Sequence, residues 1–185
     1  SEAEELLRRL KELVDEVLKR LRDMIKRSED LARDVLRKHE DLIRKLEELM
    51  KKVEDLADKI SDKDTVRELV KEVKKRLERL LRESEKLSKR VKEELKRSLD
   101  RSKELVDRVV ETVREILKRL RDAGVPEEVV REIERIVREV TERLRRLVEE
   151  NAEVVKRVEK ELKELNDELR RVVEEIVRKA KEKTK

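Results

Sequence analysis

The feature that most constrains this chain is an apolar pattern of seven-residue period that runs along nearly all of its 185 residues. Leu, Val and Ile recur at alternating spacings of three and four, and most residues between them are charged. One such series runs from Val14 to Leu56. Residues three and four apart share one face of an α-helix, so the pattern predicts helices with a continuous apolar face. A pattern sustained well beyond about 25 residues indicates a coiled coil, a membrane span or a helical repeat.

Helix-breaking residues occur in only two places. The segment 61–65 is rich in turn and cap residues, and Thr65 with Glu68 has the spacing of a capping box. At the second place, Gly124 suits the left-handed position just after a helix, and Pro126 suits the first position of the next one. The predicted helices therefore lie at about 2–60, 64–123 and 126–183.

Each predicted helix is long, roughly 88 Å at ~1.5 Å per residue. The two connections are too short for anything but antiparallel neighbours, so we expect an all-α, up-down-up three-helix bundle, an antiparallel coiled coil. We expect it to form a single domain over residues 1–185. Leu, Ile, Val and Met never occur more than two in a row, which excludes a membrane-spanning segment.

Uncharged polar residues fall on core-facing positions, while the surface positions are almost all charged. With the first turn centred near residue 62, position i of the first helix lies beside about 124 − i of the second and i + 124 of the third. This register gathers the polar residues into two cross-sections. The serine–asparagine layer comprises Ser28, Ser98, Ser102 and Asn151, and the histidine layer comprises His39, Ser84, Ser88 and Asn166. Thr112 and Thr141 are further polar residues on the core face.

Grouping these residues has an energetic reason. A buried polar group without a partner costs roughly 1–3 kcal/mol, so groups placed together can satisfy one another. Such layers also disfavour other registers, which would leave the same groups unpaired. We therefore interpret both layers as structural hydrogen-bond networks that specify the topology.

The composition is narrow: 56% of the residues are charged, and Phe, Trp, Tyr and Cys are absent. The apolar residues are Leu, Val, Ile, Ala and two Met, which pack in well-defined rotamers and bring no stray polar atoms. In this alphabet, its caps and its polar layers, the chain resembles de novo designed helical bundles with buried hydrogen-bond networks. The resemblance implies a structural scaffold without a natural biochemical activity.

The sequence also contains residues that could suggest an enzyme. His39 beside Ser84 or Ser88 invites a nucleophile–base pair. No core Asp or Glu would orient the imidazole, however, and a packed three-helix core leaves no substrate pocket. One His without Cys cannot supply the ligands of a zinc site, and a single glycine cannot form a phosphate loop. We expect no catalytic, cofactor-binding or metal-binding residues and no cofactor.

The net charge of +5 arises mainly in the second helix, which raises the question of nucleic acid or anionic lipid. No aromatic side chain is present for base stacking, and acidic residues interleave with the basic ones, so we expect neither partner. We expect a monomer that requires no partner. A designed helix-binding or switch module and a homo-oligomer building block remain the alternatives. The N-terminus lacks a targeting signal, and the localisation is not indicated.

Overall fold

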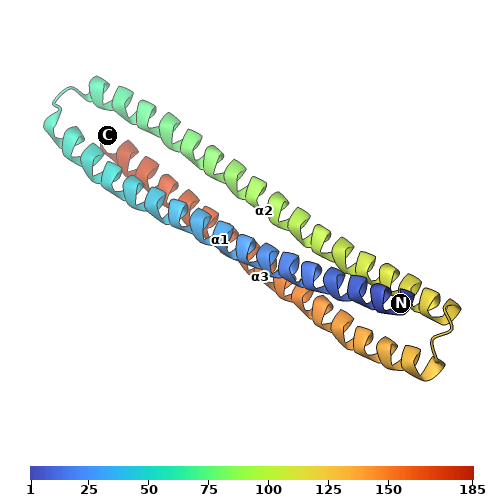
Figure 1. Ribbon diagram of the computed structural model, residues 1–185. Coiled ribbons are helices and arrows are strands. Elements are labelled where there is room, and N and C mark those ends of the chain that lie inside the picture. Colours follow the sequence, from blue (N-terminus) through green and yellow to red (C-terminus); the bar gives the residue numbers. More distant parts are fainter. The chain divides into compact units, whose positions relative to one another are not determined.

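The computed structural model describes residues 1–185, and it is built from three long α-helices without any strand (Figure 1). The helices are α1 (Glu2–Lys59), α2 (Lys63–Asp122) and α3 (Glu127–Glu182). Their bounds agree with the predicted ranges to within a few residues. The prediction of three helices separated by two short turns is confirmed.

The first turn is capped by Asp62, not by Thr65 as the sequence spacing predicts. The Asp62 carboxylate accepts hydrogen bonds from the Asp64 backbone N–H at 3.0 Å and from the Thr65 hydroxyl at 2.9 Å. These bonds, led by the one from Thr65, lower the pKa of the Asp62 carboxyl. Thr65 therefore supports the cap as a donor, and α2 begins directly after Asp62, one residue earlier than predicted.

In the second turn Gly124 has the predicted geometry, whereas Pro126, predicted as the first residue of the next helix, lies directly before α3. Gly124 has a φ of 81°, a left-handed conformation in which a residue with a Cβ is strained. The Gly124 N–H donates to the Arg121 carbonyl at 3.0 Å, and the Val125 N–H donates to the Leu120 carbonyl at 3.1 Å. This pair of bonds is a Schellman motif, which satisfies carbonyls that the end of α2 leaves free.

The helices form two compact units, each containing a segment of every helix. Unit 1 comprises Ser1–Asp30 and Glu94–Lys156, and unit 2 comprises Leu31–Glu93 and Arg157–Lys185. Within each unit, α2 runs antiparallel to α1 and α3, so each is an up-down-up three-helix bundle (Figure 1). The predicted fold class is confirmed, whereas a single domain over 1–185 stays a prediction.

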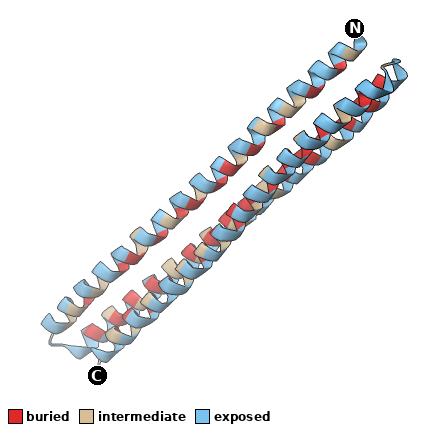
Figure 2. Cartoon of the chain, turned by 90° about the horizontal axis from the view of Figure 1, so that it is seen from below, coloured by how far each residue is buried: buried red, intermediate tan, exposed pale blue.

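Each unit has an apolar core of Leu, Val and Ile. Leu120, Val130 and Leu144 are fully buried in unit 1, as are Leu77 and Leu162 in unit 2. Buried residues recur along one side of each helix while the other sides are exposed (Figure 2). Burial of one such side chain contributes about 1.5–3 kcal/mol, so the apolar faces are the main source of stability.

The long apolar series of α1 leaves the core toward its end. Leu21 and Val35 are 1% and 3% exposed, but Leu56, predicted to face the core, is 48% exposed. A seven-residue repeat drifts about 20° per heptad around a straight helix, so a long series rotates away from the face on which it began. Val53, three residues before Leu56, is 5% exposed and keeps this end of α1 packed.

Candidate functional site

The serine–asparagine layer lies in unit 1 and joins all three helices. The Ser28 hydroxyl on α1 donates to Asn151 Oδ1 on α3 at 3.2 Å, and Asn151 Nδ2 donates to Ser102 Oγ on α2 at 3.2 Å. Ser28, Ser102 and Asn151 are 2%, 0% and 1% exposed. A directional chain of hydrogen bonds therefore runs from α1 through α3 to α2 in a dry interior.

Ser98 takes part in this layer through its backbone only. Its carbonyl accepts a hydrogen bond from the Ser102 hydroxyl at 2.9 Å, and its half-buried side chain makes no hydrogen bond with Ser28 or Asn151. Met24 takes the place next to the serines: its carbonyl accepts from Ser28 at 3.0 Å, and its sulfur lies 3.4 Å from Ser102 Oγ. The seam pattern gave no signal for the Met24 sulfur.

The histidine layer lies in unit 2 and also draws on all three helices. The Ser84 hydroxyl on α2 donates to His39 Nε2 on α1 at 2.8 Å, and Ser88 Oγ lies 3.3 Å from the same nitrogen. Asn166 Oδ1 on α3 lies 3.3 Å from Ser84 Oγ, within hydrogen-bond distance. His39, Ser84 and Ser88 are buried and Asn166 is half-buried. The structure thus brings together all four residues that the register assigned to this layer.

The second ring nitrogen of His39 identifies the tautomer. His39 Nδ1 lies 2.9 Å from the Val35 carbonyl oxygen, which can only accept a hydrogen bond. Nδ1 must therefore carry a proton, and Nε2 of the neutral ring accepts from Ser84, the nearer of the two serine hydroxyls. Asn166 Oδ1 also lies 3.3 Å from Nε2.

Both layers also use carbonyls one helical turn back. Ser28, His39 and Ser102 each bond to the carbonyl four residues earlier, and Thr141 does the same with Val137 at 2.8 Å. Short polar side chains in helices commonly make this bond. The carbonyls of Met24, Val35 and Ser98 are therefore partners within the same helix, which the register between helices does not predict.

No buried side-chain nitrogen or oxygen lacks a hydrogen-bond partner. Such groups cost roughly 1–3 kcal/mol each when they are unpaired, so two satisfied layers can exist within an apolar core at small cost. Each layer therefore fixes which residues of the three helices lie side by side. Setting the register of the helices is the property that the layers most clearly provide.

Ser84 and His39 are oriented like a nucleophile and its base, since the hydroxyl donates to a ring nitrogen whose other nitrogen is held by a carbonyl. They are, however, 6% and 2% exposed, and no carboxylate or backbone donor site adjoins them among their hydrogen bonds. A substrate carbonyl would need to displace packed side chains to reach the Ser84 hydroxyl. No cluster of three or more His, Cys, Asp or Glu residues has the arrangement of a metal site.

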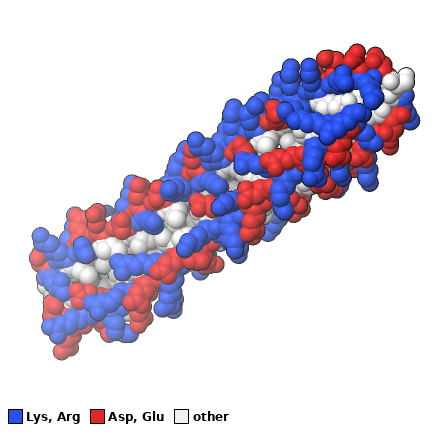
Figure 3. All heavy atoms as spheres, turned by 180° about the vertical axis from the view of Figure 1, so that it is seen from behind, with Lys and Arg blue, Asp and Glu red and all other residues white.

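The surface is a mixture of both charges. Lys, Arg, Asp and Glu interleave over the face seen in Figure 3, with uncharged atoms exposed in strips between them. In unit 2, the Arg170–Glu85 pair at 2.6 Å links α3 to α2, and Lys183, directly after α3, pairs with Asp58 of α1 at 2.8 Å. Exposed pairs of this kind contribute little to stability. None of the three helices contains an apolar stretch long enough to span a bilayer.

No protein-family model and no curated protein sequence matches the chain. Among solved structures, the chain is similar to one described as a "Computationally designed three helix bundle". The two share 16% sequence identity and a TM-score of 0.49, over 98% of this chain and 87% of the other.

Proposed function

We propose that this protein is a designed structural scaffold without a natural biochemical activity, in which two buried polar layers specify how the helices pair. The observation that carries the proposal is that no buried side-chain nitrogen or oxygen lacks a hydrogen-bond partner. Each layer takes side chains from α1, α2 and α3, so a shift of any one helix would break its hydrogen bonds.

The composition supports the same proposal. Apart from the polar layers and Thr141, the buried core is aliphatic, most exposed residues are charged, and each turn has a helix cap of its own kind. The hydrophobic pattern, the helix caps and the polar pairing all favour the same structure. Such agreement is expected of a sequence designed for that structure. We further propose that the protein is a monomer, since each layer closes its hydrogen bonds within a single chain.

The test removes one layer while keeping the core apolar. In a Ser28→Ala, Ser102→Ala, Asn151→Leu variant, we expect a melting temperature equal to or above that of the parent, because no polar group is left unpaired. We expect this variant to lose its single state, giving several oligomers by light scattering or several sets of amide NMR signals. The matched control is Leu144→Ala, which should lower the melting temperature and leave one monomeric state.

A layer-free variant that stays one monomer with the parent's NMR pattern would show that the polar groups do not specify the topology.

The absence of activity has its own test, hydrolysis of p-nitrophenyl acetate. We expect the parent and His39→Ala to give the same rate, because the buried His39 ring does not reach the ester. A parent rate that is lost in His39→Ala would contradict the scaffold proposal.

A further inference from the structure

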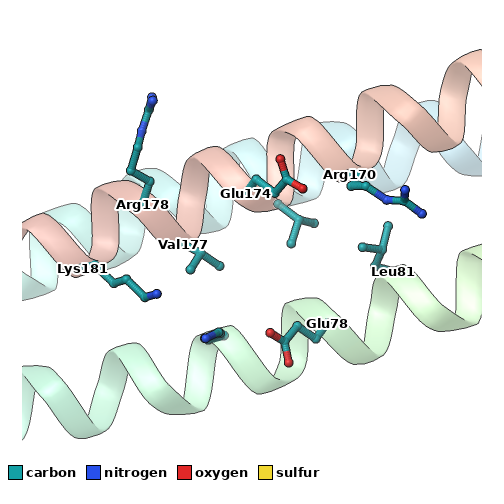
Figure 4. Close-up of a pocket in the computed structure, with 9 residues that line it drawn as sticks. Glu78, Leu81, Arg170, Glu174, Val177, Arg178 and Lys181 are labelled. Atoms are coloured by element: carbon teal, nitrogen blue, oxygen red, sulfur yellow. The ribbon is translucent and has the colours of Figure 1, made fainter.

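Away from the polar layers, α2 and α3 of unit 2 border an open groove of about 510 Å³. Its floor is formed by Leu81, Val173 and Val177, of which Val173 is buried and the other two are half-buried. In Figure 4, Leu81 and Val177 point into the space between the two helices. The groove falls in the size range of small-ligand sites, about 300–1,000 Å³.

The charged side chains along the rim differ in their pairing. The Arg170 guanidinium is bound by Glu85 at 2.6 Å, and this hydrogen bond raises the pKa of Arg170. Lys74 and Lys181, which also line the groove, have no carboxylate within 4.0 Å. Arg178 points away from the groove in Figure 4. Two ammonium groups at the rim are therefore available to an anion.

These two lysines lie at the same end of the groove. The residues that line it run from Lys74 to Leu81 on α2 and from Arg170 to Lys181 on α3. Because α2 and α3 are antiparallel, the first lining residue of α2 and the last of α3 meet at one end. Figure 4 shows Lys181 at that end and Arg170 at the other. The groove thus has a cationic end and an apolar floor that leads away from it.

We propose that this groove binds a single medium-chain fatty carboxylate. The head group would pair with Lys74 and Lys181, and the alkyl chain would lie along Val177, Val173 and Leu81. The lining segment of α3 spans about 16 Å at ~1.5 Å per residue, which suits an extended alkyl chain of medium length.

The rim favours an alkyl chain over a docked helix as the occupant. Glu78 and Glu174 border the groove without a cation within 4.0 Å, so both carboxylates depend on water. A helix laid over the groove would cover them, and burial of an unpaired charge is costly. An alkyl chain is only as wide as one aliphatic side chain, so it covers the floor and leaves both carboxylates hydrated.

The test titrates the full-length protein, carrying ¹³C-labelled methyl groups, with decanoate below its micelle concentration. We expect saturable shifts confined to the methyls of Leu81, Val173 and Val177 and their neighbours. Decyltrimethylammonium has a chain of the same length with the opposite charge, and we expect it to bind more weakly.

A Lys74→Gln, Lys181→Gln variant should raise the Kd for decanoate about two- to tenfold, as expected for losing two exposed ion pairs. The matched control, Lys75→Gln with Lys163→Gln, makes the same charge change on the same two helices outside the groove and should leave the Kd unchanged. Val177→Gln should also weaken decanoate binding, because it replaces an apolar side chain of the groove floor. Thermal unfolding of each variant verifies that the fold is intact.

Three results would overturn the proposal: equal binding of the cationic amphiphile, equal Kd values for the two double-lysine variants, or shifts spread over both units. None of these measurements bears on the polar layers, so the scaffold proposal stands or falls separately.

Discussion

His39 illustrates how a titratable side chain is held in an apolar core. Both ring nitrogens have partners: the Val35 carbonyl accepts from Nδ1, and Ser84 donates to Nε2 at 2.8 Å. A hydrogen bond that replaces one to water has a small net value, but a buried group that loses its partner bears the full cost of desolvation. The layer should therefore affect stability most when one of its residues is removed and the partner stays buried.

We predict that His39→Leu destabilises the fold by about 1–3 kcal/mol, because Ser88 loses the ring nitrogen that lies 3.3 Å away and Ser84 loses its shortest bond. The triple variant His39→Leu, Ser84→Ala, Ser88→Ala should regain most of this loss, since no hydroxyl is then stranded. Guanidinium unfolding of the three proteins measures both steps. A single variant more stable than the parent would contradict a closed network.

The tautomer of His39 can be read directly, because it is the only histidine in the chain. We predict that ¹⁵N NMR of the neutral ring shows a protonated Nδ1 and an unprotonated Nε2, as the Val35 carbonyl requires. Ser84→Ala should shift the Nε2 resonance strongly and the Nδ1 resonance little. A ring protonated on Nε2 would mean that the Val35 contact is not a hydrogen bond in solution.

At the scale of the elements, the two turns end the helices by different chemistry. The first relies on a side-chain cap at Asp62, and the second relies on backbone conformation at Gly124. These differences determine how each turn responds to mutation and to pH.

Gly124→Ala should cost about 1–2 kcal/mol, the strain of placing a residue with a Cβ in the left-handed region. No atom lies within 4 Å of the added Cβ, so a steric clash contributes nothing. Gly124→Asn should cost less, because asparagine tolerates this conformation better. Denaturant unfolding distinguishes the two variants, and an alanine variant as stable as the parent would show that the turn adopts another conformation.

The Asp62 cap predicts a dependence of stability on pH. Its pKa is lowered in the folded state, chiefly by the hydrogen bond from Thr65 and next by the Asp64 N–H. The stabilisation is therefore fully present above 3.8, the ordinary pKa of the carboxyl, and is lost as pH falls through the lowered value. Asp62→Asn keeps an oxygen acceptor but does not titrate.

We expect the free energy of unfolding of the parent to exceed that of Asp62→Asn at pH 7, with the difference shrinking as the pH falls below about 4. Chemical denaturation at several pH values in constant salt measures this difference. A difference that stays constant from pH 7 to pH 2 would show that the carboxylate charge has no part in the cap.

For the whole molecule, the sequence pattern was sufficient to predict the three helices, both turns and the fold class. The register argument also named residues that the structure places together, as with Ser28, Ser102 and Asn151. It could not predict that the Ser98 hydroxyl stays outside the layer or that the Met24 sulfur enters it. Heptad position determines the face of a residue, whereas rotamers and local packing decide which atoms meet.

The seven-residue repeat also fails to predict the exposure of Leu56. A strict period of seven treats every member of a series as equivalent, but an α-helix has 3.6 residues per turn. The series therefore drifts off the core face, and Leu56 ends 48% exposed. Predicting its position requires knowing how far the helices supercoil, which the pattern alone does not specify.

If the layers set the register of the helices, stability must depend on whether the polar residues of the three helices meet, and not only on how many polar residues the core contains. Leu144 precedes Asn151 by one heptad and is 0% exposed, so Leu144→Asn with Asn151→Leu moves the amide to an apolar level without changing the composition. The amide oxygen and the amide N–H then lack their serine partners, whereas Ser28 and Ser102 keep the carbonyls of Met24 and Ser98. We predict a loss of roughly 2–6 kcal/mol, since each stranded group costs about 1–3 kcal/mol.

The decisive variant moves the serines as well. Leu21 and Val109, 1% and 0% exposed, lie one heptad from Ser28 and Ser102 in the direction that follows the amide. The variant combines the exchange of Leu144 with Asn151 with two more, of Leu21 with Ser28 and of Val109 with Ser102. Together they rebuild the layer one heptad away. We predict that this six-residue variant recovers most of the lost stability in guanidinium unfolding. If it were no more stable than the variant with the amide moved alone, pairing across the three helices would not be what makes the buried polar groups tolerable.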